Sequence, residues 1–465
     1  MSVEKKYETL LLEGQLASSG LVSGTFFLHP RGYFVWSQIQ RYLDREFGRL
    51  GVQNVLFPAL IPLSTFVEEK ELNESLDLDE IMKIHSDKTE PTSVATLRPT
   101  SEILFSHFFK ERLQERSVHL PYLLNQWSSV YRSEKNTKLF FRSKEFYWQE
   151  LHSVHNHQEE AEAYLAKIHE IYQSLLMNVL CIQPISGEKT FLERFPGAEK
   201  TLSNECILPD GQTLQLTTSH YLGDFFSKFL NIRYFKSNEE SINPVQLSAG
   251  CSTRLLGALV EMHKDPIGIV LPWDLSPQQI AILTTGENEE EELNKFLDEL
   301  TKNLENYRLY IDATDTSFGK KISKVETLGI PMTIIVGKKE IVSQILTCKP
   351  RISEEKKQIP IEKIAEGMEG FKAFYNSTLL DRSRDFLANL IQESRNWEEL
   401  TQLISEGKVV LAPWFDDQEN ERNLKSLKHT FSIRCIKERI QEESNLVCIF
   451  SNQPANCLAY FGRSY

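Results

Sequence analysis

Two neighbouring strand-like segments constrain the fold of this chain more than any other feature. The first ends in Tyr131-Arg-Ser-Glu134, and the second begins, after a short polar loop, with Arg142-Ser-Lys-Glu-Phe146. Successive side chains on a strand point to opposite faces, so residues two apart share a face. From Arg142, one face carries Lys144, Phe146, Trp148, Glu150 and His152. A face this polar is unsuited to a protein core, so we expect antiparallel sheet that carries either a substrate site or an exposed surface.

The residues that bound these segments suit a nucleotide. Arg132 can meet an anionic phosphate or carboxylate, and Arg142 can hold a distal phosphate, because a guanidinium is planar, charged and bidentate. Glu134 can accept a hydrogen bond from the exocyclic amine of adenine, and Phe146 offers a ring on which the base can stack. Motifs of two residues recur by chance, so a plain exposed strand pair remains the alternative.

Length and composition are those of a globular protein with two or three domains. The chain has 465 residues, of which 41% are hydrophobic and 25% charged. No run approaches the roughly 20 apolar residues that span a bilayer, and residues 1–6 are polar with no apolar segment after them. We therefore expect a cytoplasmic protein with no membrane partner.

The charge and the cysteines exclude two further classes. A net charge of −13 disfavours non-specific binding to polyanions, and we expect no DNA partner. A local basic patch for one specific nucleic acid remains compatible with this charge. The seven cysteines include no Cys-x-x-Cys pair, which argues against a disulfide framework.

Helical and strand patterns alternate in the first part of the chain. Apolar residues at helical spacing predict a helix over 30–50 that Gly51 ends. The apolar run 54–62 contains Pro58, which makes it an edge strand that either pairs with a second subunit or stays a plain edge. The further elements expected are a loop over 97–103 entering a helix through Glu111 with Thr100 or Ser101 as N-cap, a helix over 157–178, antiparallel sheet over 185–215, and a strand, a turn containing Gly250 and a helix over 245–262.

The pattern changes after residues 272–277, which are typical of a linker. Strands over 280–283, 308–311 and 333–336 alternate with helices over 287–305 and 319–328. This alternation predicts a small α/β domain. A third unit over 380–465 is expected to begin with a helix over 381–406 and to end in short strands.

Separated motifs together resemble the class II aminoacyl-tRNA synthetases. Pro58 stands where motif 1 has its proline, Arg132-x-Glu134 with Arg142-x-x-x-Phe146 resembles motif 2, and Gly250-x-Ser-Thr-Arg254 resembles motif 3. Within that class the chain is most similar to the prolyl-tRNA synthetases, over nearly its whole length. The segments that carry this similarity are Arg98-Pro-Thr-Ser-Glu102, Asn125-Gln-Trp127, Glu145-Phe-Tyr-Trp-Gln-Glu150, Phe195-Pro-Gly-Ala198, Thr218-Ser-His220 with Leu222-Gly223, and Gly462-Arg-Ser-Tyr465.

The resemblance implies an α+β fold in three parts. A class II antiparallel-sheet catalytic domain would occupy residues 1–275, an α/β anticodon-binding domain residues 276–378, and a small α+β C-terminal domain, similar to a zinc-binding one, residues 379–465. Phe146 and Gly250 are about 100 residues apart. That spacing leaves no room for the editing insertion of bacterial-type enzymes, so the chain resembles the archaeal and eukaryote-like form.

The activity that the resemblance implies is that of a homodimeric ligase. It would activate L-proline with ATP and Mg²⁺ and transfer the proline to tRNA(Pro). One alternative is a catalytically silent synthetase-like subunit that binds tRNA or regulates, but such relatives usually lose the residues equivalent to Arg132, Glu134, Arg142 and Arg254. The other alternative is a class II synthetase for another amino acid, and the matched positions offer no cysteine for the pocket zinc that threonine recognition uses.

The resemblance also assigns parts of the substrates to residues. The proline-binding residues would be Thr100, Ser101, Glu102, Arg132, Trp148, Glu150 and His220, with Glu102 meeting the secondary ammonium. The ATP-binding residues would be Arg132, Glu134, Arg142, Ser143, Phe146, Gln215, Thr218, Ser252 and Arg254, with Arg132 and Arg254 as the catalytic groups. Mg²⁺ would lie near Gln215 and be held through ATP. Strict strand alternation puts Gln215 opposite Thr218 and His220, so a bulge or a strand end must intervene.

The chain departs from the family in two places. The family's C-terminal zinc site uses four cysteines, and here Phe415, Asn420 and Phe450 take three of those positions. Cys448 alone cannot form a tetrahedral site, so we expect no structural zinc. In the catalytic domain Leu151, Thr217, Ala249 and Lys264 stand where Gly, Gly, Trp and Gly are usual, which affects the pocket shape but no charge-bearing group.

The expected anticodon-binding unit carries two pairs of lysines. Gly319-Lys320-Lys321 and Gly337-Lys338-Lys339 fit the pattern of the family. Their side chains either contact tRNA phosphates and base edges or are solvated surface groups. The resemblance further implies that the carboxylate of Tyr465 folds toward the active site.

Overall fold

The structure of the chain is a computed structural model that describes residues 6–64, 81–84, 95–236, 240–286, 290–441 and 445–465. The first residues of the helix expected over 287–305 lie outside the described residues. Within the described ranges no helix is long and apolar enough to cross a membrane.

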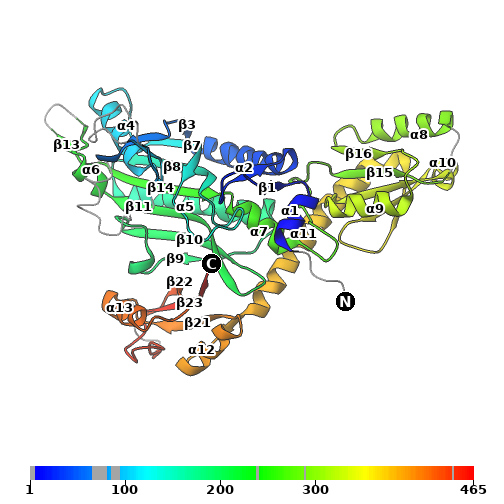
Figure 1. Ribbon diagram of the computed structural model, residues 1–465. Coiled ribbons are helices and arrows are strands. Elements are labelled where there is room, and N and C mark those ends of the chain that lie inside the picture. The colour runs from blue at the N-terminus through cyan, green and yellow to red at the C-terminus, as the bar shows by residue number, and fades with distance from the viewer. Residues whose placement is uncertain (1–5, 65–80, 85–94, 237–239, 287–289, 442–444) are drawn as a thin grey trace.

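An eleven-stranded sheet runs through the molecule and joins two of the expected units (Figure 1). Its strand order is β20-β21-β23-β22-β9-β10-β11-β14-β8-β7-β3. The strands that precede residue 275 are β3 (Gln53–Asn54), β7 (Tyr122–Tyr131), β8 (Glu145–His155), β9 (Ile185–Glu188), β10 (Lys200–Ile207), β11 (Gln212–Gly223) and β14 (Val245–Ser252). From β7 to β9 all neighbours are antiparallel, as the sequence predicts.

Four strands of the C-terminal region extend this sheet. They are β20 (Ile391–Glu393), β21 (Val409–Trp414), β22 (Ser432–Arg439) and β23 (Cys457–Ser464). Strand β22 meets β9 at the pair Ile436 and Glu188, and β23 runs parallel to β11 over Gln212 and Thr213. The C-terminal unit is therefore hydrogen-bonded into the sheet that carries the candidate site.

Helices cover one face of the sheet and bury the main apolar core. These are α1 (Tyr7–Glu13), α2 (Pro30–Arg49), α5 (Gln158–Ser174) with the π-helical turn η1 (Leu175–Val179), and α7 (Arg254–His263). Leu151 and Leu247 point into this core from the sheet, and Ile39, Leu43 and Ile168 meet them from the helices. The side chains that alternate with Leu151 therefore point to the opposite, cavity-bearing face.

The cavity-bearing face is covered at one end by α4 (Glu102–Gln114) and α6 (Phe225–Phe229). Phe105 and Phe109 of α4 pack on Leu124 and Val154 of the sheet. The short strand pairs at the periphery are β1 (Ala17–Ser19) with β2 (Phe26–Leu28), and β12 (Tyr234–Phe235) with β13 (Ser241–Ile242). A three-stranded sheet is formed by β4 (Leu60–Pro62), β6 (Ala95–Leu97) and β5 (Lys83–Ile84). Pro58 lies between β3 and β4, in neither strand, and β3 is an edge of the main sheet.

A separate α/β unit lies at the right of Figure 1. Its five strands are β15 (Ile280–Thr284), β16 (Leu309–Asp312), β17 (Met332–Val336), β18 (Ile345–Pro350) and β19 (Lys357–Pro360), in the order β16-β15-β17-β18-β19. Its helices are α8 (Glu290–Asn303), α9 (Phe318–Thr327) and α10 (Lys338–Ser343). The strands β15, β16 and β17 are parallel, as the alternation of elements predicts.

A long helix connects this unit to the C-terminal strands, and here the sequence prediction is wrong. The helix expected over 381–406 is instead α11 (Ile364–Leu390), followed by β20 and by α12 (Trp397–Ser405); α13 (Gln418–Ser426) comes later. The residues Met368, Phe371 and Tyr375 of α11 are buried in the core of the α/β unit, which extends the helix upstream. Gly250 also differs from its prediction, since it lies within β14 and not in a turn.

Candidate active site

A cavity of about 260 Å³ opens on the face of the sheet that the helices leave uncovered. Side chains from β8, β11, β14 and the segments that follow β7 and precede α7 line it. The lining includes these residues singled out in the sequence: Glu102, Arg132, Glu134, Arg142, Ser143, Phe146, Trp148, Glu150, Gln215, Thr218, His220, Ser252 and Arg254. Thr100 and Ser101 lie behind it and bond to residues that line it.

Glu150 is the most enclosed carboxylate of the cavity, with 1% of its surface exposed. Its Oε1 accepts hydrogen bonds from Ser101 Oγ at 2.9 Å, Gln126 Nε2 at 3.1 Å and Ser128 Oγ at 3.2 Å. Its Oε2 is buried and has no hydrogen-bond partner among the described residues. Because a buried carboxylate oxygen without a donor is costly, this oxygen suits a cationic ligand in the cavity.

The carboxyl group of Glu150 stays ionised despite its enclosure. Burial raises its pKa, but the neighbouring His152 imidazole, the charge of Arg98 and the hydroxyl of Ser101 outweigh burial and lower it. The ring of His152 lies with Nε2 3.8 Å from Glu150 Oε2 and stacks on Phe105 at a centroid distance of 3.9 Å. This end of the cavity therefore carries a fixed negative charge.

Thr100 and Glu102 lie at the entrance to α4. The hydroxyl of Thr100 donates to Glu102 Oε2, and Glu102 is the first residue of the helix. Ser101 is the N-cap residue, but its side chain bonds to Glu150 and makes no capping hydrogen bond. The loop before α4 is held by Arg98, which donates to the carbonyl oxygens of Phe57, Pro58 and Ser129.

His220 forms the floor of the same end. Its Nδ1 lies 2.9 Å from Thr201 Oγ1, and its ring packs against Phe195 at a centroid distance of 4.9 Å. Burial, together with the neighbouring His152, lowers the pKa of His220 to about 3. The imidazole is therefore neutral at physiological pH and shapes the cavity without adding charge.

Arg132 lies over two neighbouring aromatic rings of β8. Its guanidinium carbon is 5.5 Å from the ring centroid of Phe146 and 5.4 Å from that of Trp148, and its Nε donates to the carbonyl oxygen of Pro99 at 3.2 Å. Trp148 in turn requires Gly250 on the neighbouring strand, because a Cβ at that position would collide with the indole nitrogen. These contacts fix the direction of the guanidinium.

Two further arginines line the opposite end of the cavity. Arg254 donates through Nε to the carbonyl oxygen of Phe141 at 2.9 Å, and Arg142 lies with its Nε 3.8 Å from Glu134 Oε2. Burial first, and then the positive charges of Arg132 and Arg142, lower the pKa of Arg254 to about 10. Three guanidinium groups therefore lie close enough to repel one another.

Tyr465 contacts the loop that carries Arg142. Its main-chain oxygen accepts a hydrogen bond from Arg142 Nη2 at 3.3 Å, and its ring packs on Phe141 at 4.9 Å. Lys138 Nζ lies over the rings of Tyr7, Phe141 and Tyr465 at 5.2, 4.7 and 5.3 Å. The first helix and the C-terminal residue thus both hold the loop that carries Arg142.

A β-bulge explains how Gln215 reaches the cavity. Opposite Asn204 and Glu205 of β10, strand β11 supplies Thr217 and Gln215, so Leu216 is the extra residue. The extra residue shifts the alternation by one position and puts Gln215 in the same cavity as Thr218 and His220. The sequence required a bulge or a strand end between Gln215 and Thr218, and the structure has a bulge at Leu216.

Relations between neighbouring strands add residues to which the sequence assigned no role in the site. Gln126 and Ser128 bond to Glu150 from β7, and Glu193, Arg194 and Phe195 form a wall of the cavity. The alternation of side chains on β7 could have found Gln126 and Ser128, since they lie opposite Glu150 and Trp148. Lys144, expected on the cavity face, is not part of the lining, because β8 begins only at Glu145.

Comparisons with known proteins agree with this geometry. Residues 86–263 match the family model described as tRNA synthetase class II core domain (G, H, P, S and T), residues 279–370 match an anticodon binding domain, and residues 397–465 match the C-terminal region of prolyl-tRNA synthetase. The proline–tRNA ligase of Ureaplasma parvum serovar 3 is 36% identical over 461 residues, which cover 99% of this chain and 96% of that protein. The chain belongs to the prolyl-tRNA synthetase family. A second relative, the proline–tRNA ligase of Malacoplasma penetrans, is also 36% identical, over 99% of this chain and 97% of that protein.

Solved structures of prolyl-tRNA synthetase share this fold. The enzyme of Cryptosporidium parvum in complex with halofuginone and AMPPNP aligns with a TM-score of 0.92 and 27% identity, over 99% of this chain and 94% of that chain. The same values hold for its complex with L-proline and AMP. The class II α+β fold that the motifs predict is thereby confirmed.

Of the four positions at which the sequence predicts departures from the family, Thr217 and Ala249 line the cavity, and Leu151 and Lys264 do not. Leu151 and Ala249 belong to the core beneath the sheet, and Lys264 pairs with Glu261 at 2.7 Å at the end of α7. Thr217 is in the cavity wall, but its hydroxyl accepts a hydrogen bond from Asn204 Nδ2 at 2.9 Å. Leu151 and Lys264 therefore lie away from the cavity, whereas Thr217 and Ala249 contribute small uncharged side chains to its wall.

The C-terminal positions expected to have lost zinc ligands are filled by side-chain contacts. Asn420 Nδ2 donates to the carbonyl oxygen of Phe415 at 2.8 Å and lies 3.5 Å from Cys448 Sγ. Phe450 packs between Trp397 and Trp414. In the part of the chain that the structure describes, no three His, Cys, Asp or Glu side chains converge as metal ligands.

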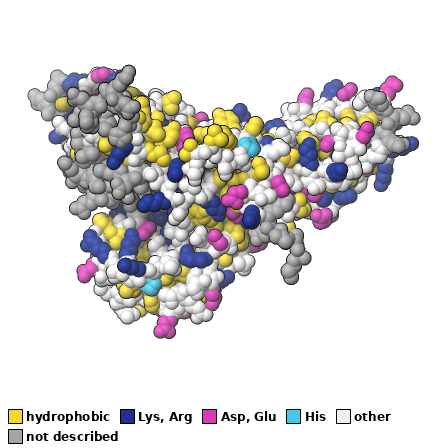
Figure 2. Space-filling model, viewed as in Figure 1, with side chains coloured by type: hydrophobic (Ala, Val, Ile, Leu, Met, Phe, Trp, Pro, Cys, Tyr) yellow, Lys and Arg dark blue, Asp and Glu magenta, His cyan; other side chains and the backbone are white. Residues whose placement is uncertain are grey.

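The lysines of the α/β unit divide into two kinds. Lys321 is 2% exposed and donates to the carbonyl oxygens of Thr284 and Asp312, so it is a structural cation of this unit. Lys320, Lys338 and Lys339 are exposed. On the face in Figure 2, basic and acidic side chains are interspersed over this unit, so neither sign of charge dominates that face.

Proposed function

We propose that the protein is a homodimeric, cytoplasmic enzyme that activates L-proline with ATP and transfers it to the 3′ end of tRNA(Pro). The observation that carries the ligase chemistry is the convergence of Arg132, Arg142 and Arg254 on one cavity. Like charges at close range repel, so this arrangement is most favourable with an anion between the groups. A triphosphate provides that anion.

Adenylate formation requires two anions to meet. A proline carboxylate oxygen attacks the α-phosphorus of ATP, the bond to the bridging oxygen of the β-phosphate breaks, and diphosphate leaves. Arg132 bridges the carboxylate and the α-phosphate, Arg254 and Arg142 neutralise the charge on the departing end, and Ser143 and Ser252 flank them. Catalysis by positioning and charge neutralisation needs little acid–base chemistry.

The nucleoside part of ATP is assigned to the aromatic and polar side chains beside the arginines. Phe146 stacks on adenine, and Glu134 accepts from its exocyclic amine. Gln215 and Thr218 lie on β11, and their polar groups in the cavity suit the ribose and the phosphates.

The proline is assigned to the end of the cavity that carries Glu150. The secondary ammonium of proline meets Glu102 and the unsatisfied Oε2 of Glu150. Trp148 and His220 enclose the ring, and Thr100 and Ser101 hold the two carboxylates in place. A neutral His220 suits an apolar ring, because it adds no charge beside the methylene groups.

Mg²⁺ fits the donors present. Magnesium keeps several waters and takes substrate phosphates as ligands, so it requires few protein carboxylates. Gln215 lines the cavity, and its side-chain oxygen is a ligand of the kind that holds such an ion or one of its waters. When bound through ATP, the ion would neutralise charge on the phosphates. We expect no structural zinc, since Asn420 and the phenyl rings occupy the other three ligand positions.

The second step forms the ester with tRNA. The terminal hydroxyl at the 3′ end attacks the aminoacyl carbonyl carbon, and AMP leaves with the electrons of the broken bond. A phosphate oxygen of the adenylate takes the proton of the hydroxyl. The exposed Lys320, Lys338 and Lys339 of the α/β unit are assigned to phosphate contacts with the anticodon stem and loop.

The organisation that we propose is a catalytic unit over 1–275, an anticodon-binding unit over 276–378 and a C-terminal unit over 379–465. Two copies would associate along the edge of the main sheet next to α2. Leu56 and Leu60 are 77% and 55% exposed beside that edge, which supports an apolar contact there.

Pyrophosphate–ATP exchange tests the proposed function against its alternatives. With each of the twenty amino acids in turn, proline should support the fastest exchange. Exchange that is fastest with another amino acid would assign the enzyme to that substrate. No exchange with any amino acid, in a protein that still binds tRNA(Pro), would identify a catalytically silent subunit.

A further inference from the structure

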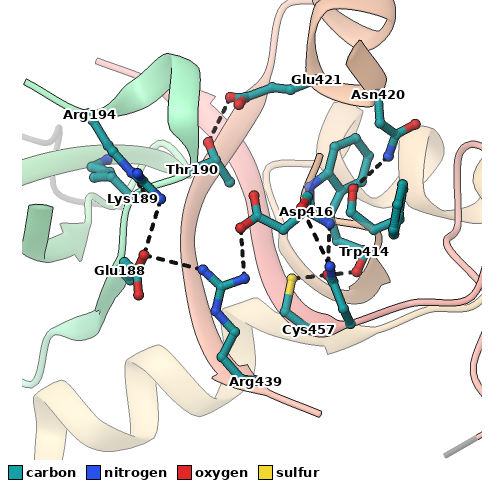
Figure 3. Close-up of polar contacts among 12 residues, drawn as sticks. Glu188, Lys189, Thr190, Arg194, Trp414, Asp416, Asn420, Glu421, Arg439 and Cys457 are labelled. Atoms are coloured by element: carbon teal, nitrogen blue, oxygen red, sulfur yellow. Dashed lines mark hydrogen bonds and ion pairs between the residues drawn. The ribbon is translucent and has the colours of Figure 1, made fainter. Parts of the chain in front are cut away.

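Helix α13 of the C-terminal unit is held by hydrogen bonds and an ion pair to the segment that leads into the cavity wall. Glu421, which is 2% exposed, accepts a hydrogen bond from Thr190 Oγ1 at 2.6 Å and one from the N–H of Leu192 at 2.9 Å. Lys425 of the same helix donates to the carbonyl oxygen of Leu192 at 3.2 Å and lies 3.1 Å from Glu193 Oε1. Figure 3 shows Glu421 and Thr190 facing each other across the two units.

The segment that α13 contacts is the short 3-10 helix η2 (Phe191–Glu193), and the residues directly after it are part of the cavity wall. Glu193, Arg194 and Phe195 all line the cavity. The N–H of Phe195 donates to Thr201 Oγ1 at 3.3 Å, and the same hydroxyl lies 2.9 Å from His220 Nδ1. Leu192, which bonds to α13, is thus three residues before Phe195, whose ring packs on His220.

The strands beside α13 anchor the C-terminal unit to the catalytic sheet. Glu205 of β10 is fully buried and bonds to Lys189 and to Arg434 of β22, whose Nε lies 2.9 Å from Glu205 Oε2. Glu188 pairs with both Arg194 and Arg439, at 3.3 and 3.2 Å (Figure 3). Loss of one partner from a buried ion pair leaves the other charge uncompensated, so these contacts resist separation of the two units.

We propose that Glu421 and Lys425 are positioning residues for the proline end of the active site, and that they act through η2 on Phe195 and His220. The inference rests on the proposed function, because it assigns this end of the cavity to the amino acid. Neither residue lines the cavity, so neither touches the substrate.

The geometry predicts an effect on proline and not on ATP. Phe195 and His220 lie at the end that carries Glu150, whereas Arg142 and Arg254 are held by Tyr465 and Phe141 at the other end. Loosening η2 should therefore leave the phosphate site intact. A general loss of folding would weaken both substrates alike.

Steady-state exchange kinetics test this separation with matched variants. Glu421→Ala removes two acceptors for buried donors and should raise KM for proline about tenfold, with KM for ATP changed less than about twofold. Glu421→Gln keeps an acceptor for the N–H of Leu192, and its amide N–H can donate to the hydroxyl of Thr190, which is a donor in the unsubstituted protein. This variant should restore a near-normal KM for proline. Lys425→Met should shift KM for proline in the same direction as Glu421→Ala.

Two substitutions on the same helix serve as controls. Glu419 and Arg422 are exposed, and among the described residues neither side chain makes a hydrogen bond or an ion pair to η2. Glu419→Ala and Arg422→Met change the charge of α13 by the same amounts as Glu421→Ala and Lys425→Met and should leave both KM values unchanged.

Hydrogen–deuterium exchange of the protein without substrates separates this inference from the proposed function. Amides of residues 191–195 should exchange about tenfold faster in Glu421→Ala than in the unsubstituted protein or in Glu419→Ala. The inference is overturned if these amides keep their protection in Glu421→Ala, or if KM for proline and KM for ATP rise together. Absence of proline-dependent pyrophosphate–ATP exchange in the wild-type protein would contradict the proposed function. The amide measurement would still test whether the contacts of α13 order η2.

Discussion

Arg254 and Phe141 are joined by a hydrogen bond of 2.9 Å from the guanidinium Nε to the main-chain oxygen. Arg254 begins α7, whereas Phe141 belongs to the loop between β7 and β8 that also presents Arg142. The bond therefore fixes two arginines from distant parts of the chain in one orientation. The bond holds the loop and the helix together as one unit, which we propose binds the phosphates of ATP.

Substitution of Arg254 by lysine should nearly abolish activation. Lysine keeps a positive charge but lacks the planar fork that bonds to Phe141 and to a phosphate at the same time. We expect kcat/KM for pyrophosphate–ATP exchange to fall about a hundredfold or more. Arg395 is exposed on the C-terminal unit, so Arg395→Lys is the control and should retain full activity. Comparable activity in Arg254→Lys would remove this residue from the catalytic groups.

Removal of the charge on Glu150 should weaken proline binding. Glu150→Gln preserves the acceptor for Ser101, Gln126 and Ser128 but removes the charge that meets the ammonium. KM for proline should rise about tenfold to a hundredfold, with KM for ATP unchanged. Glu159, exposed on α5, provides the control Glu159→Gln.

The lowered pKa of Glu150 also predicts the pH profile of the wild-type enzyme. A carboxyl group whose pKa is below its usual value stays charged as the pH falls. KM for proline should therefore show no inflection from this group between about pH 8 and about pH 5. A rise in KM with a midpoint near pH 6 would mean that Glu150 is protonated in that range.

Buried neutral histidines should make the protein sensitive to acid. Burial lowers the pKa of His263 to about 4, and its Nε2 lies 2.7 Å from the carbonyl oxygen of Leu180. Because the unfolded chain binds this proton at the usual pKa near 6.5, stability is full above that value and falls as the pH drops toward the folded pKa. The resulting loss at about pH 5 is about 2 kcal/mol relative to neutral pH.

The variant His263→Gln isolates this contribution. Glutamine can donate to Leu180 and does not titrate, so the variant should lose less stability between about pH 7 and about pH 5, by about 2 kcal/mol in urea unfolding. His107→Gln, at an exposed histidine, should follow the wild-type profile. Parallel pH profiles for wild type and His263→Gln would contradict the buried neutral state.

Metal analysis tests the loss of the C-terminal zinc site. The purified protein should contain far less than one equivalent of zinc, and a chelator should leave its thermal midpoint unchanged. The triple substitution Phe415→Cys, Asn420→Cys and Phe450→Cys would supply three thiolates beside Cys448 and should gain zinc binding. About one equivalent of tightly held zinc in the unsubstituted protein would show that other ligands have replaced the cysteines.

Alanine should be activated at a measurable rate. A smaller side chain fits any pocket built for proline, and the lost contacts give discrimination of about 1–3 kcal/mol. We therefore expect alanine-dependent exchange about ten to a few hundred times less efficient than that with proline. Added alanyl-tRNA should not be hydrolysed in cis, and rapid deacylation by the pure protein would contradict this.

The sequence predicted the site through residues whose chemistry is unusual for their position. Arg132, Glu134, Arg142 and Arg254 are charged side chains at the ends of apolar segments, and the three arginines and Glu134 do line one cavity. The alternation of side chains also put Phe146, Trp148, Glu150 and His152 on one face, where the structure has them. Local patterns suffice when the side chains follow regular strand geometry.

The remaining parts depend on long-range contacts that local patterns do not contain. The bulge at Leu216 is set by pairing with β10, and the start of α11 by burial of Met368 and Phe371 in a neighbouring core. Lys321 resembles its exposed neighbour Lys320 in sequence, yet it is buried against Thr284 and Asp312. The pairing of β22 with β9 and the contact of Glu421 with Thr190 join residues more than 200 positions apart, and no pattern within either segment predicts them.

A structure of the protein with a non-hydrolysable ATP analogue and proline tests the central claim most directly. The account predicts phosphate oxygens within hydrogen-bonding distance of Arg132, Arg142 and Arg254, adenine against Phe146, and the proline ammonium beside Glu102 and Glu150. An analogue bound elsewhere, or phosphates that contact none of the three guanidinium groups, would contradict it.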